Sequence, residues 1–344
     1  MKEVYIDIGG KRVKFLKVDQ HPHTFRDAGT EYTDRAYKSL TDKLNAVYKE
    51  AANDLYMKQQ SFNRAHEARV KKYRAQVEAG QITEADYQAW MRGQIFQGEA
   101  WEKKREQLAE SLAKVDQTAM SMINDGKLDV FGENANYLAY QLEHKAGTNL
   151  GFGLYDQNTV KRLVRDEPRL LPRPAIDEGR DVRWYNDIIN RAVTQGILQG
   201  EDLDGITMRV ALDTGERSLS AMRRNARTAY TGAQNAGRVE GMRQAQRLGI
   251  DVKKRWMATF DAHTRDAHAD LDGQTVGVDE PFESMLGPIM YPGDPSAAPG
   301  NVYNCRCTLV YEYPQFPAEI DRRDENGENV GALTYRQWKA AKGG

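Results

Sequence analysis

Hydrophobic and polar residues alternate at the start of the chain. Val4, Ile6 and Ile8 alternate with more polar positions, two glycines follow, and a second alternating run comes after them. This pattern predicts a β-hairpin that turns at the glycine pair. Because an isolated hairpin is only marginally stable, we expect it to dock on another element. We assign the hairpin and a connector to residues 1–32.

From about Thr33 onward, the apolar positions follow helical spacing. Two stripes with intervals of mostly three, four or seven residues are formed by Tyr37, Leu40, Leu44, Val47 and Ala51, and by Trp101, Leu108, Leu112, Val115, Ala119 and Met122. They predict two long amphipathic helices that pack antiparallel. Between the stripes, Thr83 is placed to cap a helix with acidic residues in its first turn. We interpret residues 33–165 as a helical bundle, with a free coiled-coil oligomer as the alternative.

Proline residues then interrupt the helical pattern. Residues 166–180 contain three prolines within seven positions, so they can continue neither a helix nor a central strand, and we predict a linker there. The following stretch predicts a helix, a turn and the start of another helix, and residues 216–248 form the longest helical candidate of the second half. Three glycines in that candidate lower its helicity by about 1 kcal/mol each, which indicates close packing against another element.

The C-terminal part carries strand and turn signals. "VKKRWMATF" and "CTLVYEY" predict two strands, the pair Asp272-Gly273 predicts a turn, and the Gly/Pro-rich stretch from Pro281 to Gly300 predicts an irregular loop. Residues 316–344 form a polar tail with a short terminal helix. We therefore expect an α+β protein, with a mostly helical N-terminal region that includes a short β-hairpin and a C-terminal α+β domain with a small sheet over residues 181–315.

Composition adds limits without pointing to a function. The chain has 344 residues, 40% of them hydrophobic and 29% charged, with a mean hydropathy of -0.74 and a net charge of -1. These values are ordinary for a globular protein with much exposed helix surface. We find neither a run long enough to span a membrane nor the features of a signal peptide, so we expect no membrane association and a place in the cytoplasm or in something assembled there.

The two cysteines, Cys305 and Cys307, have a C-x-C spacing that disfavours a disulfide. Together with His263 and His268 they offer the four ligand types of a zinc site. The two histidines would point to different faces of a helix, and C-x-C on a strand separates the sulfurs unless a bulge brings them together. The alternative is that the cysteines are buried as small apolar residues and the histidines bond to nearby aspartates.

Two further interpretations concern the same segment. Asp261, Asp266, Asp270 and Asp272 with His268 have the residue types of a metal-dependent nuclease or hydrolase. The sequence contains no P-loop, HExxH or GxSxG pattern, and we therefore expect a non-enzymatic protein.

The other interpretation is structural. Arg265 and Arg306 are suited to bind carboxylates such as those of Asp261 or Asp272, and Asn304 is suited to bond loop backbone. Such contacts would connect the turn after the first strand to the start of the last.

The segment from Glu216 to Arg255 is locally basic, with ten lysines and arginines against three acids. Its arginines are candidates for contact with DNA phosphates: Arg223, Arg224, Arg227, Arg238, Arg243 and Arg247. A solvated face or an acidic protein partner is the alternative, since no aromatic residues suited to base stacking are interleaved with them.

The order and spacing of several motifs over about residues 180–313 resemble the phage Mu F-type minor head protein family, also called the phage head morphogenesis family. The resemblance is carried by "NARTAYTGAQNAGRVEGMRQAQRLGI", "KKRWMATFDAHTRDAHADLDGQ", "YPGDP" and "NCRCTLVYEY". It is strongest at Trp256, Asp261, Thr264, Arg265, Asp266, His268, Leu271, Asp272, Gly273, Pro292, Gly293, Asp294, Asn304, Cys305, Arg306 and Cys307.

This resemblance implies a virion head component made in the cytoplasm of the infected host. It implies association with portal protein and with major capsid or scaffolding protein, and contact with packaged double-stranded DNA. Some relatives carry a CxxC arrangement and a histidine before the C-x-C pair, which would suit zinc. Here Arg265 and Tyr303 stand at those places, so His263, His268, Cys305 and Cys307 are the remaining candidate ligands, and we expect no cofactor other than this zinc.

Overall fold

The computed structural model describes residues 2–18, 25–172, 178–313 and 334–343. It divides into two compact units, which are interleaved along the chain. The first, here called the hairpin unit, comprises Met1–Gln20, Asp42–Ser121 and Ala175–Arg223; the second, the sheet unit, comprises His21–Thr41, Met122–Pro174 and Arg224–Gly344. The sequential domain boundaries given above stay a prediction, and the predicted linker lies partly outside the described residues.

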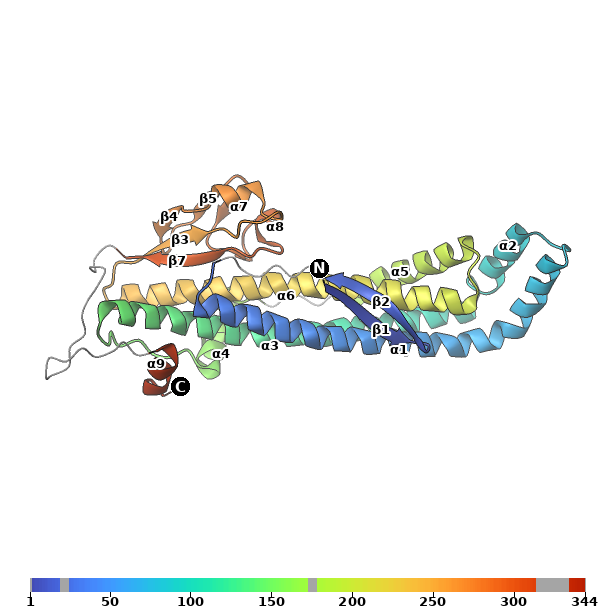
Figure 1. Ribbon diagram of the computed structural model, residues 1–344, viewed down its shortest axis with the longest axis horizontal. Coiled ribbons are helices and arrows are strands. Elements are labelled where there is room, and N and C mark those ends of the chain that lie inside the picture. Colours follow the sequence, from blue (N-terminus) through green and yellow to red (C-terminus); the bar gives the residue numbers. More distant parts are fainter. Residues whose placement is uncertain (1, 19–24, 173–177, 314–333, 344) are drawn as a thin grey trace. The chain divides into compact units, whose positions relative to one another are not determined.

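The described residues form helices and short strands, labelled in Figure 1. The helices are α1 (Ala28–Glu78), α2 (Glu84–Gln94), α3 (Glu99–Ala146), α4 (Gln157–Asp166), α5 (Glu178–Leu198), α6 (Leu203–Arg247), α7 (Asp266–Asp270), α8 (Pro299–Val302) and α9 (Tyr335–Ala341). The strands are β1 (Lys2–Ile8), β2 (Lys11–Val18), β3 (Lys253–Met257), β4 (Thr275–Gly277), β5 (Phe282–Ser284), β6 (Gly287–Ile289) and β7 (Thr308–Glu312). The predicted α+β class is confirmed.

Helix ends follow from local capping. Helix α1 begins before the expected position near Thr33, because Asp27 and Thr30 bond each other's backbone N–H groups at 2.8 and 2.9 Å. Thr83 caps α2 as predicted, in a capping box with Asp86. The short terminal helix is confirmed as α9, which Thr334 caps in the same way.

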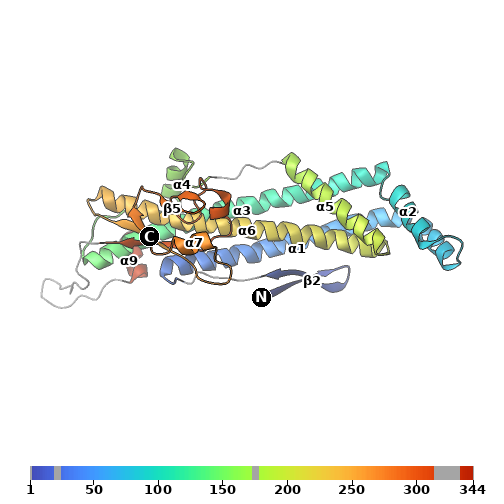
Figure 2. The ribbon, with the colours of Figure 1, turned by 90° about the horizontal axis from the view of Figure 1, so that it is seen from above.

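In the hairpin unit, the predicted hairpin is confirmed and packs on helices. β1 and β2 pair antiparallel, and both turn glycines have positive φ, as a tight turn requires. Phe15 of β2 is buried so close to α6 that a Cβ at Gly215 would lie 2.7 Å from its ring. Helix α5 lies beside the first part of α3 (Figure 2), where Arg105 Nη1 donates to Asn190 Oδ1 at 2.9 Å.

In the sheet unit, β3 is the central strand of a three-stranded sheet with the order β4-β3-β7. β3 and β7 pair antiparallel and align Trp256 with Leu309, both of which are fully buried. The two strands predicted from the sequence are thus confirmed. The stretch from Pro281 to Gly300 is not an irregular loop as expected, since it contains the β5–β6 hairpin and the first residues of α8.

Helix α6 supports this sheet through polar side chains and close backbone contact. The buried Asn235 side chain accepts a hydrogen bond from Leu309 N at 2.8 Å and donates to Pro292 O and Cys307 O at 3.2 Å each. At Gly232 an added Cβ would lie 2.7 Å from the carbonyl oxygen of Gly293. The close packing predicted from the glycines is therefore present.

Candidate functional site

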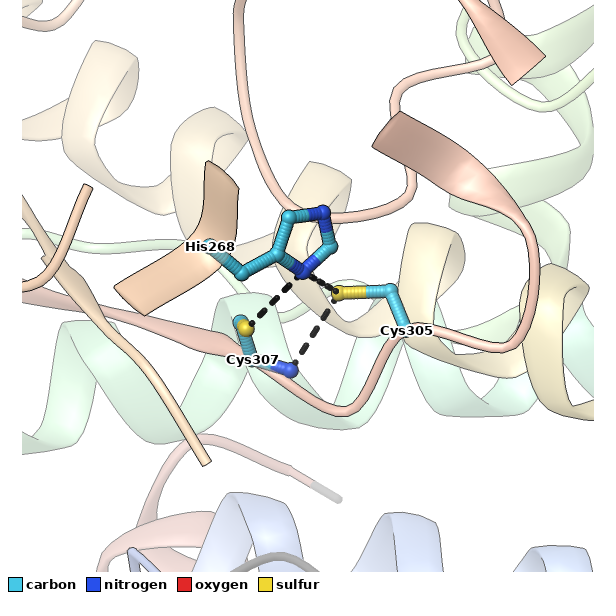
Figure 3. Close-up of side chains that lie close together, drawn as sticks. All are labelled: His268, Cys305 and Cys307. Atoms are coloured by element: carbon cyan, nitrogen blue, oxygen red, sulfur yellow. Dashed lines mark hydrogen bonds between the residues drawn. The ribbon is translucent and has the colours of Figure 1, made fainter. Parts of the chain in front are cut away.

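The site lies where α7 meets the segment that leads into β7 (Figure 3). His268 is the only histidine of α7, and the two cysteines come just before and just after Arg306, ahead of the first strand residue, Thr308. Asn304 has a φ of 56°, a left-handed conformation that turns the chain immediately before Cys305. The cysteines precede the strand, so their backbone does not have the extended spacing of a β-strand. The expectation that C-x-C would separate the two sulfurs therefore does not apply.

Three potential metal ligands converge here. His268 Nδ1 lies 3.6 Å from Cys305 Sγ and 3.5 Å from Cys307 Sγ. All three ligand atoms lie within 4.8 Å of one another, and the three residues are 2–3% exposed. No other group of three or more His, Cys, Asp or Glu side chains in the described part of the chain approaches in this way.

Hydrogen bonds to backbone groups orient the three side chains. His268 Nε2 lies 3.0 Å from the carbonyl oxygen of Asn301. A carbonyl oxygen only accepts, so Nε2 carries the proton and the lone pair of Nδ1 faces the sulfurs. The backbone N–H of Cys307 donates to Cys305 Sγ at 3.3 Å.

The surroundings shift the pKa values of the two thiols in opposite directions. Burial is the main cause that raises the pKa of the Cys305 thiol well above its ordinary value. The pKa of Cys307 is lowered well below its ordinary value, mainly by the hydrogen bond from Cys305, despite burial. Cys307 is thus the thiol that ionises more readily, and the thiolate is the form that binds metals.

His263 does not join this group. Its side chain is exposed, its backbone N–H donates to Asp261 Oδ1 at 2.8 Å, and it lies in the turn before α7 begins at Asp266. The two histidines therefore do not share a helix, and the structure assembles three of the four predicted ligands.

The remaining signature residues hold the strand, turn and strand together. Both Nη atoms of Arg306 bond the carboxylate of Asp261, one of them at 2.9 Å, as the structural interpretation expected. Asp272 accepts from Ala258 N at 2.8 Å and so fixes the turn after β3. Arg265 departs from expectation, because it donates to the carbonyl oxygen of Tyr303 and not to a carboxylate.

Other signature positions serve turns and packing. Thr264 Oγ1 accepts from Asp261 N at 3.0 Å, and Asp294 accepts from Met290 N at 3.0 Å. The Trp256 ring packs edge-on against His268 with centroids 5.8 Å apart. Of the others, Leu271 and Pro292 are buried and Asp266 is exposed. Gly273 and Gly293 have positive φ angles of 79° and 84°. The backbone N–H of Asn304 donates to Thr228.

The hydrolase alternative is not favoured by this geometry. The ring nitrogens of His268 face Asn301 O and the two sulfurs, and no aspartate belongs to the cluster. Asp261 is occupied by Arg306, and Asp272 by the backbone of Ala258. Asp261 and Asp272 thus fix the local structure, Asp266 and Asp270 are exposed, and the four aspartates do not surround a common reaction centre.

The six arginines proposed for DNA contact do not share one environment. Arg223, Arg227 and Arg238 are buried, and each bonds a side chain of its own unit: Asn45, Asp34 and Asp27, respectively. Arg243 pairs with Asp279 and the more exposed Arg247 with Glu240, while Arg224 is exposed. Burial removes the first three from contact with a nucleic acid in this conformation.

Two residues that matter for the site were missed in the sequence. Asn235 lies in a run of small and polar residues that gave no indication of its hydrogen bonds to Pro292 and to the segment that forms β7. Asn301 orients His268 through its carbonyl oxygen, a group that every residue has, and its Oδ1 accepts from Ser284 Oγ at 3.1 Å. Only the three-dimensional arrangement reveals these roles.

Comparison with known proteins agrees with the motif set. The family described as "Phage Mu protein F like protein" matches residues 187–310, which include α6, the three-stranded sheet and the His-Cys cluster. The resemblance to the phage Mu F-like family is thereby confirmed. The Mu F-like region is the part of the chain that contains every signature residue named above.

Three curated proteins are similar to this chain. Minor head protein GP7 of Bacillus phage SPP1 is 29% identical over 250 residues, which cover 70% of this chain and 78% of GP7. NAD(+)--arginine ADP-ribosyltransferase EFV of Enterococcus faecalis is 32% identical over 210 residues, or 59% of this chain and 41% of that protein. The uncharacterized protein YqbB of Bacillus subtilis is 27% identical over 128 residues, 36% of this chain and 41% of YqbB. No solved structure matches significantly.

In the residues that the structure describes, no helix has the length and apolar character needed to cross a membrane.

Proposed function

We propose that this protein is a minor head protein that acts in phage head morphogenesis and resides in the virion head. The observation that carries the proposal is the similarity to GP7, which extends over about twice the length of the region 187–310 and over most of both chains. A match confined to residues 187–310 would say less, because it would leave the N-terminal half of the chain unmatched.

The geometry supports a non-enzymatic role. The signature residues bond backbone groups, form the Arg306–Asp261 ion pair or pack in the core. One relative is named as an ADP-ribosyltransferase, but the similarity covers 41% of that protein. Its activity is therefore attributed to that protein alone, and the residues described here give no separate support for such an activity in this chain.

We propose that the protein binds portal protein, and major capsid or scaffolding protein, during head assembly in the host cytoplasm. The test is to isolate procapsids from infections with and without the gene, and to assay co-purification of this protein with portal protein. We expect the protein in wild-type procapsids and fewer infectious particles without the gene. Normal head assembly and full infectivity in its absence would contradict the proposal.

Contact with packaged DNA is proposed for the exposed arginines only. Arg224 and Arg247 are exposed residues of α6, whereas Arg238 is only 2% exposed. Reversing the charge of Arg224 and Arg247 together should weaken duplex DNA binding and reduce its salt dependence. Unchanged affinity, or affinity that does not fall as salt rises, would contradict the DNA contact without affecting the proposed role in the head.

A further inference from the structure

We propose that His268, Cys305 and Cys307 bind one Zn²⁺ ion through Nδ1 and the two Sγ atoms. The inference does not depend on the proposed function, because it rests on the cluster alone. The three ligand atoms come from two segments that α8 and the β5–β6 hairpin separate in sequence. A bound ion would join α7 to the start of β7.

The distances suit tetrahedral coordination. Zinc lies about 2.3 Å from a thiolate sulfur and about 2.0–2.1 Å from an imidazole nitrogen, so tetrahedral angles place nitrogen and sulfur roughly 3.5–3.6 Å apart. The two observed Nδ1–Sγ distances are 3.6 and 3.5 Å. The nitrogen–sulfur distances therefore already suit the ion, and the two sulfurs, which lie within 4.8 Å of each other, would come to about 3.8 Å apart on binding it.

The hydrogen bonds around the three side chains are also those of a metal site. A histidine that binds zinc usually donates its other N–H to a carbonyl or carboxylate, which fixes the ring and directs the free lone pair at the metal. Asn301 O does this for His268 at 3.0 Å. The N–H of Cys307 stabilises negative charge on Cys305 Sγ in the same way, at 3.3 Å.

Charge and donor type select the ion. Two thiolates and a neutral imidazole with one divalent cation give a neutral complex, which can remain buried without an additional counter-ion. Binding converts two thiols into thiolates and releases two protons, and no electron is transferred. Sulfur and imidazole donors without a carboxylate favour Zn²⁺ over Mg²⁺, Ca²⁺ or Mn²⁺.

The test uses the untagged full-length protein, purified without chelator. Mass spectrometry of the metal content should give one zinc per chain, and replacement by Co²⁺ should produce a thiolate-to-cobalt charge-transfer band. Cys307→Ser and Cys305→Ser should lower zinc affinity at least about tenfold in a chelator competition. His263→Gln is the matched control and should retain full zinc content.

If a cysteine variant does not fold, the cobalt spectrum of the wild-type protein still shows whether thiolates bind the metal. A wild-type protein that is folded but binds neither zinc nor cobalt with thiolate ligation would overturn the proposal. So would full zinc content in folded Cys305→Ser and Cys307→Ser variants, because the ion would then lie elsewhere. Neither result would bear on the role in head assembly.

Discussion

The two parts of α6 are buried in different ways. In the hairpin unit, residues 203–223 alternate between buried and more exposed positions, and large apolar side chains such as Val210 and Leu219 face inward. In the sheet unit, every residue from Tyr230 to Met242 is buried, although many of them are polar or glycine. Amphipathic spacing accounts for the first part, whereas the second is buried by the backbone and polar groups that surround it.

The polar side chains of the second part are almost all hydrogen-bonded. Thr231 Oγ1 donates to Cys305 O at 2.7 Å, and Arg238 bonds both carboxylate oxygens of Asp27 at 2.7 and 2.9 Å and Leu309 O at 2.8 Å. A buried polar group without a partner is costly, so such contacts specify one arrangement of helix and sheet. The comparison shows that burial in this helix does not follow from hydrophobicity alone.

The largest effect should come from Asn235. Asn235→Leu leaves the N–H of Leu309 and the carbonyl oxygens of Pro292 and Cys307 without this partner, and we expect a loss of about 3–5 kcal/mol in the free energy of unfolding. The matched change in the hairpin unit is Asn63→Leu, which loses donations to Thr207 and to a helical carbonyl and should cost about 1 kcal/mol. Urea denaturation measures both, and equal losses would remove the contrast between the units.

A smaller effect on stability should distinguish alanine substitutions at two glycines. At Gly232 a methyl group would lie 2.7 Å from the backbone oxygen of Gly293, so Gly232→Ala should cost about 1–3 kcal/mol. At Gly93 in α2 nothing lies within 4 Å of an added Cβ, so Gly93→Ala should stabilise by up to about 1 kcal/mol. Thermal denaturation of both variants checks the opposite signs. A stabilising Gly232→Ala would mean that the close approach is not required.

The secondary structure was largely predictable because local patterns determine it. The hairpin at Gly9, the capped start of α2 and the strands around Trp256 and Leu309 follow from alternation, capping residues and helical spacing. The β5–β6 hairpin was missed, because three-residue strands within a Gly/Pro-rich stretch give no periodic signal. The interleaved units could not be predicted either, since they depend on contacts between segments far apart in sequence.

The candidate site was predictable in its residue types and not in its geometry. The ion pair between Asp261 and Arg306 was one of several pairings that the sequence allowed. The exclusion of His263 depends on where α7 begins, and the approach of the cysteines depends on the turn at Asn304. The buried state of Arg238 was hidden because a basic helix on its own suggests a surface.

Two aspartates whose side chains are largely removed from solvent should give opposite pH responses. In the hairpin unit, burial is the main cause that raises the pKa of Asp116 to about 6, although Tyr48 and Tyr185 donate to it. The folded pKa exceeds the unfolded value, so wild-type stability falls as pH rises through this range. We expect Asp116→Asn to reduce that fall by about 1–3 kcal/mol between about pH 4 and 7.

In the sheet unit, burial would raise the pKa of Asp27, but Arg238 and Thr30 outweigh it and the pKa is lowered. This carboxylate therefore contributes stability above its unfolded pKa, near 4, and the contribution is lost as pH falls. Asp27→Asn should destabilise more at neutral pH than at about pH 3. Urea denaturation across pH measures both aspartates. The same sign for the two variants would show that the two environments do not differ in this respect.

The central claim is that the Mu F-like signature is a structural frame. A double-mutant cycle with Asp261→Asn and Arg306→Gln tests it most directly, because the bidentate pair joins the turn after β3 to the start of β7. We predict a coupling of about 1–3 kcal/mol in the free energy of unfolding. A coupling near zero, with each single variant as stable as the wild type, would contradict the claim.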